Sequence, residues 1–152
     1  ASMENVGGDC KVKCGRAHGV YFASPNGVLT IQDSRFARGH DQGHLVKTGA
    51  RKTVIEHTVL DERHGDGSRA IDAYNGGHLI LNDVTIYAKA DDGNPDIIGW
   101  NYERRTNHPK NRIRLEDVTV YCDQGSRLIG FKNHGAPEVV GRENVRWPNG
   151  KC

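Results

Sequence analysis

The chain repeats one short phrase five times, and this repetition limits its fold more than any other feature of the sequence. Each phrase holds a strand-like piece, a Gly or Asn turn, a second strand, an acidic or amide pair, and a third strand. An apolar residue occupies the same place in every first strand and recurs every 25 to 31 residues: Val20, Val46, Ile71, Ile98 and Ile129. A recurrent interval of this length predicts a solenoid in which each phrase forms one coil.

Alternation of apolar and polar residues within each phrase assigns the inward faces of the strands. The first strands contribute the inward pairs Val20/Phe22, Val46/Thr48, Ile71/Ala73, Ile98/Trp100 and Ile129/Phe131. The second strands contribute Leu29/Ile31, Val54/Ile55, Leu79/Leu81 and Ile113/Leu115. The third strands are anchored by Phe36, Leu60, Ile86, Val120 and Trp147.

A polar pair follows each second strand and indicates a bend before the third. The pairs are Gln32-Asp33, Glu56-His57, Asn82-Asp83, Glu116-Asp117 and Glu143-Asn144. Asn and Asp tolerate bend dihedrals and can bond neighbouring backbone, so stacked copies can form a ladder along the axis. Three strands per coil, a fixed polar bend and an apolar interior predict an all-β fold, a right-handed parallel β-helix of about five to six coils.

Length and charge restrict the domain count and the classes of partner. With 152 residues, 36% of them hydrophobic, we expect a single domain over residues 4–152. The mean hydropathy is −0.68 and apolar runs are short, so we expect neither a membrane span nor a membrane partner. The 21 basic residues are scattered among 19 acidic ones, which gives no electrostatic footprint for nucleic acid.

The phrases HGVYF, GHLVKTGARKTVIEHTVLDE and AIDAYNGGHLILNDVTI resemble bacterial right-handed parallel β-helix repeat proteins. These proteins are related in architecture to pectate-lyase-like polysaccharide lyases and mannuronan epimerases. The resemblance covers residues 17–147 and implies the fold. It does not fix an activity, because this superfold hosts lyases, hydrolases, epimerases, adhesins and phage tailspikes. Members usually have more coils than five, so the chain is expected to be a fragment, a truncated gene product or a minimal member.

The two ends of the chain depart from the repeat. Ala1-Ser2-Met3 resembles a short artificial extension, and residues 4–16 are expected to form an N-terminal cap or an incomplete coil. Cys122 and Cys152 are one coil apart, which places them on neighbouring rungs within disulfide reach. Free buried thiols are the alternative, the pairing of Cys10 and Cys14 stays open, and the spacing does not favour zinc. A disulfide favours a secreted or periplasmic location.

The outward positions of the first strands form the candidate site. Residues between the inward pairs line up as one solvent-facing column, in which the two glycines are expected to leave open floor: Tyr21, Lys47, Asp72, Gly99 and Gly130. The stripe is aromatic, basic and acidic, which suits an extended anionic polysaccharide, because cations meet carboxylates while Tyr lies against sugar faces. An ordinary polar β face with cross-strand pairs is the alternative.

One coil is longer than the others because NYERRTNHPKN is inserted between Trp100 and Ile113. Insertions in solenoids map to loops, often on the binding face, and this one would wall a groove with cations that clamp a uronate carboxylate. A solvated charged loop is the alternative. The catalytic candidates, as acid and base for β-elimination or C5 epimerisation, are Lys47, Tyr21, His44 and Asp72. The substrate-binding candidates are Tyr74, Asn101, Arg104, Arg105 and Lys132.

No metal site or cofactor is predicted. GHDQGH places His40 and His44 four apart, but the glycines favour a turn over a helix that would bring them together. The turn DDGNPD over residues 91–96 is rich in oxygen ligands and is the candidate for calcium, although it lacks the spacing of a known loop.

Two functions remain open at this point. The first is a carbohydrate-active enzyme acting on acidic polysaccharide. The second is a non-catalytic β-helix, either structural or glycan-binding, or a truncated remnant. In both cases the ends of a short solenoid expose unpaired strands, which predicts a homo-oligomer through the ends or a flanking sheet. As an exposed residue, Lys47 should contribute little to stability.

Overall fold

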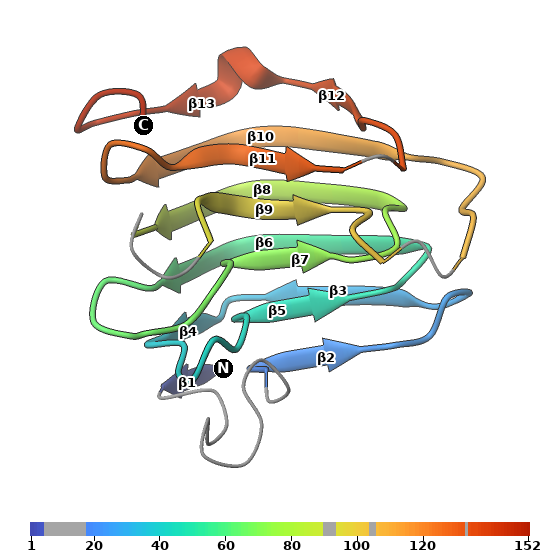
Figure 1. Cartoon of the computed structure of the whole chain (residues 1–152), viewed down its shortest axis with the longest axis horizontal. Helices are drawn as coiled ribbons and strands as arrows, with labels where there is room; N and C mark the ends of the chain where they lie inside the picture. Colours follow the sequence, from blue (N-terminus) through green and yellow to red (C-terminus); the bar gives the residue numbers. More distant parts are fainter. Residues whose placement is uncertain (5–17, 90–93, 104–105, 133) are drawn as a thin grey trace.

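The chain folds into two parallel β-sheets whose strands alternate along the sequence (Figure 1). The computed structural model describes residues 1–4, 18–89, 94–103, 106–132 and 134–152. The five-stranded sheet has the order β11-β9-β7-β5-β2 and contains β2 (Val20–Phe22), β5 (Val46–Thr48), β7 (Ile71–Ala73), β9 (Asp96–Trp100) and β11 (Arg127–Phe131).

The eight-stranded sheet faces it and has the order β1-β4-β6-β8-β10-β12. It contains β1 (Ser2–Glu4), β3 (Val28–Gln32), β4 (Arg35–Ala37), β6 (Lys52–Asp61), β8 (His78–Tyr87), β10 (Arg112–Tyr121), β12 (Glu138–Val140) and β13 (Val145–Arg146), with β3 on β6 and β13 on β10. One 3₁₀ turn, η1 (Arg142–Asn144), precedes β13. This architecture is all-β and compatible with a parallel β solenoid.

The register of the five-stranded sheet confirms the predicted alignment of the first strands. Backbone pairing joins Val20 to Val46, Val46 to Ile71, Ile71 to Ile98, and Ile98 to Ile129. Each pair therefore comes from consecutive phrases, one interval apart. Each strand of this sheet thus pairs in parallel with the equivalent strand of the next repeat, as in a solenoid.

The core lies between the sheets, and two inward assignments were wrong. Val54 was expected to face inward beside Ile55, but adjacent strand residues point to opposite sides. The buried neighbour is Thr53, at 2% exposure, and its hydroxyl lies 2.9 Å from that of Thr48. Each hydroxyl thus has a partner inside the core. Phe131, also expected inside, is 49% exposed because β11 is the last strand in the sheet order.

The predicted bend is present in the first four repeats, and one residue of each polar pair makes it. Asp33, His57, Asp83 and Asp117 all have left-handed backbone, with φ between 47° and 54°. Asn, Asp and His are the residues other than Gly that reach this region most readily. In the second, third and fourth repeats, the second and third predicted strands are continuous through the bend. They form the single long strands β6, β8 and β10. In the fifth coil, Gly141 and η1 replace this bend.

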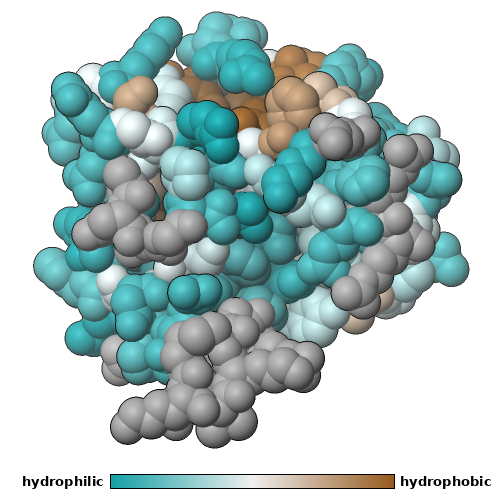
Figure 2. Space-filling model, in the orientation of Figure 1, coloured by the Kyte–Doolittle hydropathy of each residue, from teal (hydrophilic) through white to brown (hydrophobic). Residues whose placement is uncertain are grey.

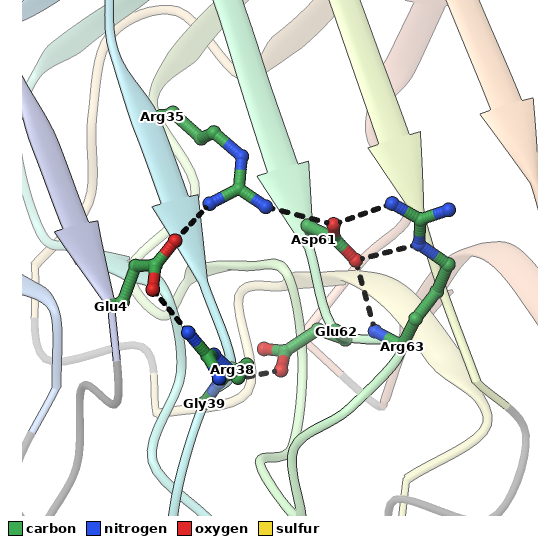
Figure 3. A network of polar contacts seen from close by, with 7 residues as sticks. All are labelled: Glu4, Arg35, Arg38, Gly39, Asp61, Glu62 and Arg63. Carbon is green, nitrogen blue, oxygen red and sulfur yellow. Dashed lines mark hydrogen bonds and ion pairs between the residues drawn. The ribbon is translucent and has the colours of Figure 1, made fainter.

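The N-terminal residues belong to the sheet, although we had left the first three out of the expected domain. Ser2–Glu4 pair in parallel with Arg35–Ala37. Figure 3 shows Arg35 between Glu4 and Asp61, at 2.6 and 3.2 Å, which links three neighbouring strands. These partly exposed pairs align the edge strand more than they stabilise it.

The C-terminal end is joined to the coil before it by a disulfide. Cys122 and Cys152 are bonded, with their Cα atoms 5.6 Å apart, which confirms the predicted pairing. Cys10 and Cys14 lie outside the described residues. Figure 2 shows an apolar area at the top of the view, over the C-terminal strands. Phe131 and Val140 are the large exposed apolar residues of these strands.

Candidate functional site

The predicted column exists on the outward face of the five-stranded sheet. Pairing joins Tyr21 to Lys47, Lys47 to Asp72, Asp72 to Gly99, and Gly99 to Gly130. We call this face, with the side chains that lie over it, the first-sheet face. Its alignment follows from the repeat, because equal positions in successive phrases are hydrogen-bonded neighbours.

The first-sheet face is covered, which contradicts the expectation of a solvent-facing column. The side chains of Asp72 and Lys47 are only 3% and 14% exposed. Gly99 and Gly130 do not leave open space above the sheet either. A Cβ on Gly99 would lie 2.5 Å from Arg69 Cδ, and one on Gly130 would lie 1.9 Å from Asp96 Cγ. Glycine is required at both places because side chains from the strand starts lie across the backbone.

Asp72 is the centre of a buried charge network. Its carboxylate lies 3.3 Å from His44 Nε2, 3.8 Å from Lys47 Nζ and 3.6 Å from an Arg69 nitrogen. Burial alone would raise the pKa of Asp72, but hydrogen bonding to His44 and the charges of His44, Arg69 and Lys47 hold the pKa below its ordinary value. The carboxylate is therefore ionised and serves as the shared counter-ion of the face.

A second carboxylate extends the network along the axis. Asp96 lies 2.7 Å from an Arg127 nitrogen and 3.9 Å from an Arg69 nitrogen, and it accepts a hydrogen bond from the Tyr102 hydroxyl. Burial and then the bond to Asp96 raise the pKa of Tyr102. Asp96 belongs to the turn considered for calcium, but its cationic neighbours already neutralise it, and residues 91–93 lie outside the described residues.

Two stacked histidines line the start of the same strands. The rings of His18 and His44 lie 5.0 Å apart and nearly parallel. Each Nδ1 accepts a hydrogen bond from a backbone N–H of the next repeat. His18 Nδ1 accepts from the His44 N–H at 3.0 Å, and His44 Nδ1 accepts from the Arg69 N–H at 3.1 Å. An accepting Nδ1 carries no proton, so the ring N–H of His44 is on Nε2, which lies 3.3 Å from Asp72. Burial, and then the charges of His44 and Lys47, lower the pKa of His18 to about 4.

This histidine makes the stability of the protein depend on pH. The unfolded chain protonates His18 near pH 6.5, whereas the folded chain does so only near pH 4. The free energy of unfolding should therefore fall as pH drops from about 6.5 to about 4, by about 1 to 2 kcal/mol after allowance for partial exposure. His18→Asn keeps an acceptor for the His44 N–H and removes the titration. Urea melts across this range should show a smaller pH slope in the variant, and an unchanged slope would contradict the assignment.

The inserted loop begins by folding over the first-sheet face, which was one of the two alternatives, but not with the expected charge. Glu103 bonds Lys47 Nζ at 2.7 Å, and the Tyr102 ring lies 4.2 Å from the Arg69 guanidinium carbon. An acid and a phenol therefore cover the column where cations were expected. Arg104 and Arg105, the expected carboxylate clamp, lie outside the described residues.

The other substrate-binding candidates are dispersed around this centre. Tyr74 is buried beside Lys47, whose Nζ lies 5.2 Å from the ring centroid. Lys132 is exposed and lies 5.6 Å from the Tyr102 ring. Asn101 instead lines a separate pocket at the end of β9, together with His108 and His134. Sequence reasoning assigned neither histidine to a site; His108 had the signal of its place in the insertion, and His134 had none.

The contacts of the candidates decide what the face can do chemically. Lys47 Nζ is already paired with two carboxylates, those of Asp72 and Glu103. His44 uses both ring nitrogens, one as acceptor from the backbone and one towards Asp72. Tyr21 is 54% exposed and packs edge-on against His18. The described candidates on this face thus form a polar and aromatic surface whose charged groups are already paired.

His40 and His44, the two histidines considered as metal ligands, make separate contacts. His40 Nδ1 lies 2.6 Å from Asp66, with Asp41 nearby, and the three could share one ion. His44 faces Asp72 instead. In the described ranges, no helix is long and apolar enough to cross a membrane.

Comparison with protein-family models gives no match, and comparison with curated proteins and with solved structures gives no significant match for this chain. Its function is therefore argued from the geometry of its own residues.

Proposed function

We propose that the chain is a right-handed parallel β-helix of about five to six coils that binds an acidic polysaccharide along the first-sheet face. The pairing of each phrase with the next supports the architecture. The observation that carries the function is the grouping of aromatic rings around a cation. Lys47 Nζ lies 5.9 Å from the Tyr21 ring and 5.2 Å from the Tyr74 ring.

Charge on this face supports an anionic ligand. Among the described residues of the network, three cations meet three carboxylates: Lys47, Arg69 and Arg127 against Asp72, Asp96 and Glu103. A fourth cation, Lys132, lies over the Tyr102 ring. In the sequence, Arg104 and Arg105 follow Glu103 directly and add two more cations. The exposed Tyr21 ring offers a flat surface to a sugar, while cations meet its carboxylates.

Binding is better supported than β-elimination or C5 epimerisation. Those reactions need a base that can take the C5 proton. Lys47 Nζ is paired with Glu103 and Asp72, and both ring nitrogens of His44 are engaged. A non-catalytic glycan-binding module therefore fits the described contacts best.

Titration with polymannuronate, polygalacturonate and a glycosaminoglycan tests this function. We expect salt-sensitive binding of at least one polymer without formation of unsaturated product. Tyr21→Ala should weaken it about fivefold, because an exposed ring contributes about 1 kcal/mol through stacking and cation contacts. Arg114→Ala is the matched control, since Arg114 is 54% exposed on β10 of the other sheet. Equal loss in both variants, or no binding by any polymer, would count against the proposal.

Two further expectations belong to the same proposal. The disulfide between Cys122 and Cys152 supports a secreted or periplasmic protein. The apolar area over the C-terminal strands supports association with a second copy. Light scattering checks the second point, and a stable monomer at high concentration would oppose it.

A further inference from the structure

A second site lies at the corner where three successive coils leave the five-stranded sheet. It is a cavity of about 200 Å³, and we call it the corner pocket. Its walls come from the turn after β7, the end of β9, the inserted loop and the segment after β11. They are formed by Asn75, Trp100, Asn101, Thr106, Asn107, His108, Asn111, His134, Gly135 and Ala136.

The chemistry of the walls is polar without being charged. Within the described part of the chain, the lining consists of amides, a hydroxyl, imidazoles, an indole and small residues, with no Lys, Arg, Asp or Glu. An ion in this cavity would lose its hydration without meeting an opposite charge, which is costly. The corner pocket thus differs in kind from the first-sheet face and favours a neutral ligand.

Two buried polar atoms of the pocket residues have no hydrogen-bond partner among the described residues: Asn101 Oδ1 and His108 Nε2. Their residues are 7% and 6% exposed. Leaving such atoms unpaired is rare in native proteins and costs about 1 to 3 kcal/mol each. Both atoms belong to residues that line the cavity.

The orientation of both side chains is fixed by other contacts. Asn101 Nδ2 donates to the His134 carbonyl at 3.0 Å, which leaves Oδ1 as the unused acceptor. Asn111 Nδ2 donates to the His108 carbonyl at 2.9 Å, which fixes the backbone that carries the imidazole. Burial lowers the pKa of His108, although a backbone hydrogen bond to Gly49 opposes this shift, so the neutral imidazole is favoured.

We propose that the corner pocket binds a neutral, hydroxyl-rich ligand of the size of one sugar ring, with hydroxyl groups on Asn101 Oδ1 and His108 Nε2. A hydroxyl group donates and accepts, so it can satisfy the amide oxygen and either tautomer of the imidazole. Asn75 and Asn107 add amide groups around the same space. The site does not depend on acidic-glycan binding at the first-sheet face.

The test uses the full chain with glucose, galactose, mannose and N-acetylglucosamine as probes, and glucuronate as the charged counterpart. Indole fluorescence is a suitable signal, because Trp100 lines the pocket. We expect saturable binding of at least one neutral probe, with glucuronate weaker. His108→Phe should weaken it about fivefold to tenfold, the equivalent of one hydrogen bond.

The thermal stability of the variants separates a ligand site from a structural one. His108→Phe removes an unpartnered nitrogen, so its melting temperature should stay level or rise. Asn101→Gly keeps the left-handed backbone, at φ 55°, and should also weaken the neutral probe. Tyr21→Ala should leave neutral-sugar binding unchanged. Absence of saturable binding by all neutral probes, equal binding of glucuronate, or wild-type affinity in both pocket variants would overturn the proposal.

Discussion

Replacing Asp72 with alanine should lower the free energy of unfolding by about 3 to 5 kcal/mol. The Asp72 side chain is 3% exposed and faces His44, Lys47 and Arg69. Its loss would leave Arg69 and Lys47, at 10% and 14% exposure, without their shared counter-ion. A buried charge whose partner is removed keeps its desolvation penalty and loses the attraction that offset it.

Urea unfolding measures this effect, and an exposed aspartate provides the control. Asp117 pairs with Arg146 at the surface, where both side chains are at least half exposed, so Asp117→Asn should cost well under about 1 kcal/mol. Asn also tolerates the left-handed backbone of that position. Similar losses in the two variants would show that Asp72 is not the centre of a buried network. By the same reasoning Lys47→Ala should destabilise the fold, contrary to the expectation from sequence.

Replacing Cys122 and Cys152 together with serine should lower the free energy of unfolding by about 3 kcal/mol. The bond closes a segment with a sequence separation of 30, and the loss of this constraint gives the unfolded chain more freedom. The effect should be concentrated in the last coil, where β12 and β13 are short strands paired only with β10 among the described strands.

Denaturant melts of the double variant and of the oxidised wild type give the size of the loss. Hydrogen exchange gives its place, and we expect faster exchange in β13 with little change in β6 and β8. The reduced wild type is the matched control, because it removes the bond without changing side-chain volume. A loss below about 0.5 kcal/mol would mean that packing of the last coil does not need the bond.

The repeat made the alignment of strands predictable, and the bends with them. Hydrogen bonding in parallel sheets joins equal positions of successive coils, so one periodic anchor such as Ile71 fixes the register of the whole sheet. Val54 was assigned to the inward face because it is apolar, although it is adjacent to Ile55 and side chains alternate at a spacing of two residues. Strict alternation would have selected Thr53, a polar residue that is acceptable inside because Thr48 pairs with it.

The cover over the first-sheet face could not be predicted from the repeat. Alternation states on which side of a strand Asp72 lies, but not what other side chains lie above it. The side chain of Arg69 lies across Gly99, and that of Asp96 lies across Gly130. Each of these side chains comes from the repeat before the glycine that it covers, so the contact is long-range in sequence. Glu103 reaches Lys47 from 56 residues away, a contact that no local pattern contains.

Mapping where an acidic oligosaccharide binds tests the central claim most directly. Backbone amide shifts of the ¹⁵N-labelled protein should be recorded while a short mannuronate or galacturonate oligomer is added. We predict that the largest changes fall on β2, β5 and β7, around Tyr21, Lys47 and Tyr74, with the outward residues of β6, β8 and β10 unchanged. Changes confined to the eight-stranded sheet, or none at saturating oligomer, would contradict the assignment of the first-sheet face as a glycan-binding surface.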